Sequence, residues 1–87
     1  MEQEQNQIYE LTLYPNPTES EMTVTTNNPA VKIVELEIFD LFGKIIQQQT
    51  VNQSYGTLKL NDLDKGVYIL KVYLNQGDVV IRKVVKR

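Results

Sequence analysis

Short segments in which apolar and polar residues alternate, separated by turn-forming residues, run through most of this chain. A period of two is typical of strands that have one face buried. Seven such segments can be assigned, and no stretch of useful length has a helical period. They cover residues 8–14, 21–26, 31–39, 44–49, 56–60, 67–74 and 79–86. Seven short antiparallel strands predict an all-β fold, with two sheets packed as an immunoglobulin-like sandwich.

The segment 31–39 has the clearest alternation. Val34, Leu36 and Ile38 are expected to face the core, and the two glutamates between them to face solvent. By contrast, residues 50–54 are polar and are expected to be irregular. The third strand therefore supplies the most definite prediction of which side chains are buried.

The last two segments are less regular. Residues 67–74 are apolar on both faces apart from Lys71, which predicts a central strand. In residues 79–86, three apolar side chains share a face with Lys83, so alternation is not strict. A bulge, or covering on both faces, would account for this pattern.

Length and composition exclude several classes of function. A chain of 87 residues makes one domain with little room for an internal cavity, so a ligand would have to bind at the surface. The absence of Cys and His removes thiol nucleophiles, thiolate metal sites and the commonest general base. A net charge of −2 argues against a nucleic-acid partner. Because no apolar run approaches the roughly 20 residues of a spanning helix, no membrane insertion is expected.

Few residues could support catalysis. If Asp62 began a calcium-binding loop, Tyr73 would fall where the closing glutamate belongs, so Asp62 and Asp64 are assigned to a self-capped turn. Ser20 and Ser54 have no histidine to activate them. We therefore expect no enzymatic activity, no metal and no cofactor.

Charge is distributed unevenly along the chain. Residues 1–7 are polar and acidic and are interpreted as the remnant of a linker, with the folded domain at 8–87. Residues 79–87 contain four basic side chains and no acid. Two interpretations of this basic end are open: protection of an edge strand against aggregation, or recognition by a partner.

Four short motifs follow one another along the chain. Two prolines end the first strand and hold the residues before them in extended geometry. The second motif fits a hairpin loop of about three to five residues, in which Gly43 supplies a positive φ. The motifs are Tyr14-Pro15-Asn16-Pro17, Asp40-Leu41-Phe42-Gly43-Lys44, Gly66-Val67-Tyr68 preceded by Leu63, and the basic end Lys83-Val84-Val85-Lys86-Arg87.

In this order the motifs resemble the C-terminal sorting domain, type A, of proteins exported by the bacterial type IX, or Por, secretion system. The first motif matches that family's YPNP, the second its D-L-x-G-K turn and the third its L-x-x-G-x-Y step. The last matches its closing strand of basic and aliphatic residues. The resemblance runs from about residue 13 to residue 87, so residues 8–87 would be the sorting domain.

The resemblance implies a sorting signal that has no catalytic activity of its own. Such a domain is covalently fused to an upstream cargo domain and is recognised from the periplasm by the outer-membrane translocon. A sortase-like peptidase typically cuts before it, and the cargo is released or anchored at the surface of a Gram-negative cell. A cut upstream of residue 13 would need exposed backbone, which residues 2–7 could supply.

The motif residues have two interpretations, as parts of turns or as residues that a partner recognises. The prolines of YPNP, with Gly43 and Gly66, are assigned to turns. The candidates for recognition by the translocon are Lys83, Val84, Val85, Lys86 and Arg87. Among them the three basic side chains are favoured, because the fold is not expected to need their charge. The last strand could then be bound as an extended edge. An exposed edge strand would also allow a weak homodimer.

Two alternatives belong to other functional classes. A carbohydrate- or protein-binding module of a secreted protein would need a flat aromatic strip, for which Tyr9, Tyr55 and Tyr73 are the available side chains. A structural spacer or adhesin repeat would occur in tandem within a longer protein.

Overall fold

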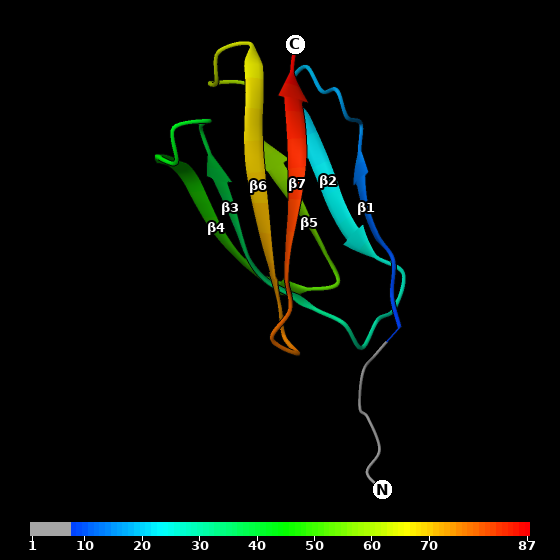
Figure 1. The fold of residues 1–87 in the computed structure, drawn as a ribbon. Helices are drawn as coiled ribbons and strands as arrows, with labels where there is room; N and C mark the ends of the chain where they lie inside the picture. Colours follow the sequence, from blue (N-terminus) through cyan, green and yellow to red (C-terminus); the bar gives the residue numbers. More distant parts are fainter. Residues whose placement is uncertain (1–7) are drawn as a thin grey trace, which may run out of the picture.

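The computed structural model describes residues 8–87 as two antiparallel sheets packed face to face, which confirms the expected all-β sandwich (Figure 1). The interpretation of residues 1–7 as a linker lies outside the described residues. One sheet has the strand order β1-β2-β5 and the other β4-β3-β6-β7. The strands are β1 (Leu11–Tyr14), β2 (Glu21–Thr26), β3 (Ile33–Phe39), β4 (Ile45–Gln53), β5 (Tyr55–Lys59), β6 (Gly66–Leu74) and β7 (Val79–Lys86).

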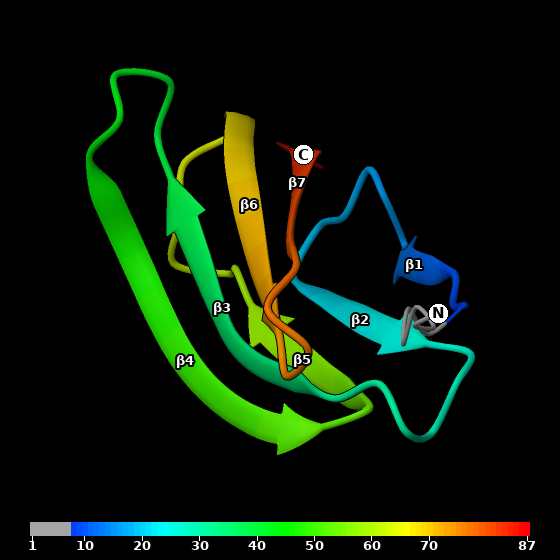
Figure 2. The same ribbon diagram turned by 60° about the horizontal axis from the view of Figure 1, so that its bottom comes forward.

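The core lies between the sheets and is built from alternate positions along their strands. Figure 2 shows the two layers, with β3 and β4 curving along one side and β1 and β2 on the other. Burial of one Leu or Ile side chain contributes about 1.5–3 kcal/mol, so this layer is the main stabilising element. The buried apolar side chains are Met22, Val24, Val31, Ile33, Leu36, Ile38, Leu58, Leu60, Leu70, Val72, Leu74 and Val84.

The alternation of β3 is interrupted by a β-bulge near its start. Leu36 and Ile38 face the core as expected, but the expectation for Val34 is wrong: it is 37% exposed, while Ile33 is fully buried. Ile33 pairs with Leu74 and Glu35 with Tyr73, so β3 advances two residues where β6 advances one. The extra residue turns Val34 outward and gives the inward place to Ile33.

Strand β4 continues beyond its expected end. Residues 50–53, expected to be irregular, belong to β4, because Thr50 pairs with Glu35 and Gln53 with Ile33. Within this part Asn52 has a φ of 59°, next to a shift in the pairing with β3. Asparagine tolerates left-handed geometry, so a bulge carries the polar segment on as a strand.

The last two strands pair in one continuous register. The prediction that β6 is a central strand is confirmed, because it lies between β3 and β7. The predicted bulge in β7 is wrong, since its pairing runs without a shift from Val79 opposite Tyr73 to Lys86 opposite Gly66. Covering on both faces is also not found within the described chain, because the three-stranded sheet packs on one face only.

The bulge in β3 makes a prediction about two adjacent apolar side chains. Ile33→Ala removes a fully buried side chain and should lower the free energy of unfolding by about 2–5 kcal/mol. Val34→Ala alters an exposed one and should change it by no more than about 0.5 kcal/mol. Urea denaturation of both variants measures the difference. Equal losses, or the larger loss at Val34, would show that the register without a bulge is correct.

Candidate functional site

The Asn16 side chain of the first motif binds the outer edge of β7. Its Nδ2 donates to the Lys83 carbonyl at 3.0 Å, and its Oδ1 accepts from the Val85 amide at 3.1 Å. One amide side chain thus pairs with β7 as a neighbouring strand would. Pro17 supports this arrangement, because a residue that precedes proline is held in extended geometry.

Two residues further on, the backbone itself pairs with β7. The Thr18 amide donates to the Val85 carbonyl at 2.9 Å, and the Arg87 amide donates to the Thr18 carbonyl at 2.8 Å. Thr18 is 1% exposed and forms a parallel bridge with Lys86. The other members of the motif, Tyr14, Pro15 and Pro17, are exposed.

The second motif is a hairpin loop organised by Asp40. Its carboxylate Oδ1 accepts from the amides of Phe42 and Lys44, both at 2.9 Å. The backbone closes the same loop, because the Gly43 amide donates to the Asp40 carbonyl at 3.1 Å and Gly43 has a φ of 88°. A left-handed φ favours glycine, so this part of the motif is required by the turn.

The third motif and Lys86 together hold the turn before β6. The Tyr68 hydroxyl donates to the Asp64 carbonyl at 2.7 Å. From β7, the Lys86 ammonium donates to the Leu63 carbonyl at 3.1 Å, and Lys86 is only 8% exposed. The Lys86 side chain is therefore part of the fold, because a buried polar group needs a hydrogen-bond partner.

The remaining residues of the basic end point in different directions. Val84 is fully buried in the core, whereas Lys83 and Arg87 are exposed. The outer backbone edge from Lys83 to Arg87 is occupied by Asn16 and Thr18. An extended edge open to a partner, as expected for this segment, is therefore not present.

Two glutamines close the opposite side of the sandwich in the same way. Gln47 Nε2 donates to the Lys59 carbonyl, and Gln49 Nε2 donates to the Thr57 carbonyl, each at 3.0 Å. These bonds join β4 of one sheet to the outer edge of β5 in the other. The sequence analysis missed both residues, although amides at alternate positions on a strand are a signal for this role.

A hydrogen-bonded cluster covers the β3–β4 side of the outward face. The Tyr73 hydroxyl donates to Glu37 at 2.6 Å, and Gln48 Nε2 donates to Glu35 at 2.7 Å and to Glu37 at 3.1 Å. The hydrogen bond to Glu37 raises the pKa of Tyr73, and desolvation and the charges of both glutamates add to it.

A second tyrosine outside this cluster is also perturbed. Burial raises the pKa of Tyr9, and its hydrogen bond to Asp78 adds to that effect.

The tyrosines do not form the flat strip that a carbohydrate-binding module would need. Tyr55 lies on β5 and faces outward from the three-stranded sheet, while Tyr73 lies on β6 and faces outward from the other. The Tyr9 hydroxyl donates a hydrogen bond to Asp78.

Residues 8–87 also contain no pocket and no group of three metal-binding side chains. No helix in this part of the chain could cross a membrane.

Comparison with known proteins identifies the family of the chain. The family described as secretion system C-terminal sorting domain matches residues 12–87. The chain belongs to this family. A relative, the ulvan lyase NLR42 of Nonlabens ulvanivorans, is 30% identical over 80 residues, which is 91% of the chain and 15% of the relative. The sorting domain therefore spans about a seventh of the length of the curated relative it matches.

The two hydrogen bonds between Asn16 and the β7 backbone, which we call the clasp, should contribute measurably to stability. Asn16→Ala removes two hydrogen bonds to the β7 backbone and should cost the sorting domain about 1–3 kcal/mol. Amide hydrogen exchange at Val85 should rise in the same variant. Asn61→Ala, at an exposed turn position, is the matched control and should change stability by less than about 0.5 kcal/mol. Equal effects at both positions would contradict the role of the clasp.

The raised pKa of Tyr73 predicts a loss of stability at alkaline pH. The unfolded phenol loses its proton around the ordinary pKa of 10.0, while the folded one holds it to higher pH. The stabilising contribution is therefore complete below pH 10 and is lost as the pH rises through the folded pKa. Tyr73→Phe should flatten this dependence in urea unfolding, whereas Tyr14→Phe, at an exposed tyrosine, should retain it. The same alkaline slope in both variants would contradict the assignment.

Proposed function

We propose that this sorting domain directs an upstream cargo domain across the outer membrane through the type IX translocon. The observation that carries the proposal is the family match over residues 12–87, nearly the whole folded unit. The structure supports it, because all four motifs contribute to the same sandwich and none provides a site for chemistry. The curated relative is a much longer protein, in keeping with a cargo joined to this domain.

In this proposal the sorting domain is a substrate of the export machinery and has no catalysis of its own. A sortase-like peptidase cuts in the segment that precedes the domain, and the cargo is released outside a Gram-negative cell or attached to its surface. The absence of Cys and His from the chain supports a non-catalytic role. The cargo supplies any enzymatic activity, as the name of the ulvan lyase relative illustrates.

We further propose that Lys83 and Arg87 are the members of the basic end that the translocon recognises, because their side chains are exposed. Lys86 supports them from within, through its bond to the Leu63 carbonyl. For a weak homodimer, β4 offers the longest exposed edge strand, since the end of β7 is already paired.

Export of a carrier tests the proposal directly. Residues 1–87 are fused to the C-terminus of a fluorescent protein that bears an ordinary export signal, and are expressed with and without a functional type IX translocon. The expected result is carrier outside the wild-type cells, shortened by the size of the domain, and full-length carrier in the periplasm of the translocon-null strain. The carrier without the domain should remain periplasmic in both strains. Retention of the folded fusion in both strains would refute the proposal.

A further inference from the structure

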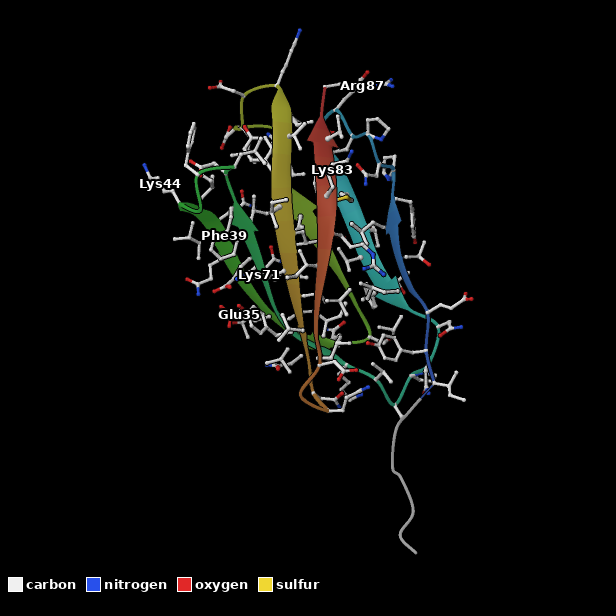
Figure 3. The ribbon with its side chains drawn as sticks, in the orientation of Figure 1. Glu35, Phe39, Lys44, Lys71, Lys83 and Arg87 are labelled. Carbon is white, nitrogen blue, oxygen red and sulfur yellow. The ribbon has the colours of Figure 1, made fainter. Side chains whose placement is uncertain are left out.

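The outward side of β6 and β7 carries four cross-strand pairs, of which Tyr73 with Val79 lies at the β6–β7 turn and the other three continue along the strands. Val67 lies opposite Val85, Ile69 opposite Lys83, and Lys71 opposite Ile81. We call these six residues the β6–β7 face. Figure 3 shows Lys71 and Lys83 on this side of the sheet, with Phe39 of β3 beside Lys71.

The apolar part of the β6–β7 face is left uncovered by the described chain. Val67 is 38% exposed and Ile81 56% exposed, although both belong to paired strands of regular register. The neighbouring β3–β4 half of the same sheet instead carries Glu35, Glu37 and Gln48 in a hydrogen-bonded cluster. A contiguous apolar row beside a polar region is typical of a surface that meets another protein.

The two lysines of the face lack acidic neighbours on their own strands. Neither β6 nor β7 contains an aspartate or glutamate. Glu37, the carboxylate opposite Lys71 on β3, already accepts hydrogen bonds from Tyr73 and Gln48. The Lys71 ammonium lies 4.8 Å from the centroid of the Phe39 ring instead. The face therefore combines an apolar row with two lysines that can form ion pairs with carboxylates of a partner.

The end of the face that contains Val67, Lys83 and Val85 lies away from the point at which a cargo would be joined. The first described residues lie at the opposite end of the sandwich, where the Ile8 carbonyl accepts from Asn28 and Tyr9 contacts Asp78 in the β6–β7 turn (Figure 1). A cargo joined there would leave Val67, Lys83 and Val85 uncovered. The outer backbone edge at the end of β7 is occupied, so a partner meets side chains of the face and not that edge.

We infer that the β6–β7 face is the surface by which the sorting domain docks on a protein of the export machinery. The partner presents an apolar patch with carboxylates that meet Lys71 and Lys83. This inference rests on the proposed function and specifies which surface is recognised. Buried apolar contact would provide affinity, and the two charge pairs would fix the orientation.

The composition of the face favours a protein partner over a membrane or a second copy of the chain. Recognition of an anionic membrane surface takes clusters of about four to eight basic residues, and this face has Lys71 and Lys83 on a flat sheet. Two copies packed face to face would bury four lysines without an acid from β6 or β7, which is costly. A partner rich in carboxylates removes that cost.

Paired variants in the carrier fusion test the inference. Ile81→Ser and the double variant Lys71→Glu, Lys83→Glu alter the face. Tyr55→Ser and Lys59→Glu are the controls on the outward side of β5; Tyr55 is 55% exposed, close to the 56% of Ile81. Folding of each is verified by circular dichroism and thermal unfolding. The face variants should lower the exported fraction by about tenfold, as loss of an interface hot spot would, and the controls by less than about twofold.

The outcomes separate this inference from the proposed function. Failure of the wild-type fusion to be exported would refute the proposed function and, with it, the inference. Normal export of the wild-type fusion and of folded face variants would overturn the inference alone.

A photo-crosslinking residue placed at position 81 gives a second measurement. It should form an adduct with a translocon component in wild-type cells, while one at position 55 should not. An adduct with a second copy of the chain would overturn the inference in favour of a dimer. Binding of the purified domain to phosphatidylglycerol vesicles that is lost on Lys83→Glu would overturn it in favour of a membrane.

Discussion

The pairing of residues 16–18 with the end of β7 is the constraint that closes one side of the sandwich and decides which parts of β7 remain open to a partner. A two-sheet sandwich leaves an unpaired strand edge wherever a sheet ends, and backbone groups at such an edge need partners. Here Asn16 and Thr18, which follow β1 of one sheet, bind β7 of the other. Gln47 and Gln49 join β4 to β5 on the opposite side. Side-chain amides thus hold the two sheets together at both sides.

This arrangement changes what the motifs of the family mean. Asn16, Asp40 and Tyr68 each satisfy backbone groups of a turn or an edge, and so specify the fold. The polar atoms of these side chains already form hydrogen bonds within the fold, so they are less available to bind a partner. Recognition must then use side chains outside these bonds, and the outward faces of the strands offer the largest set of them. The motifs identify the family, while the docking surface proposed above uses outward side chains of β6 and β7 that make none of these bonds.

The sequence predicts the fold class, the central place of β6 and the burial of Leu36 and Ile38, because period-two alternation follows directly from strand geometry. It does not predict the outward orientation of Val34 or the length of β4, since a bulge depends on how neighbouring strands pair and not on local composition. Lys86 was missed for a related reason. A lysine at a chain end is usually solvated, and only the position of the Leu63 carbonyl makes its burial favourable.

The basic end contains buried residues that the fold uses as well as exposed ones, so its deletion cannot separate recognition from folding. Loss of residues 84–87 would remove a fully buried valine, the Lys86 bond to the 61–65 turn and the partners of Thr18. An export defect in such a deletion would follow from unfolding alone. Lys83 differs, because its carbonyl supports the clasp while its side chain points outward. Substitution of that side chain retains the backbone bond, so it tests the proposed recognition while the sandwich remains intact.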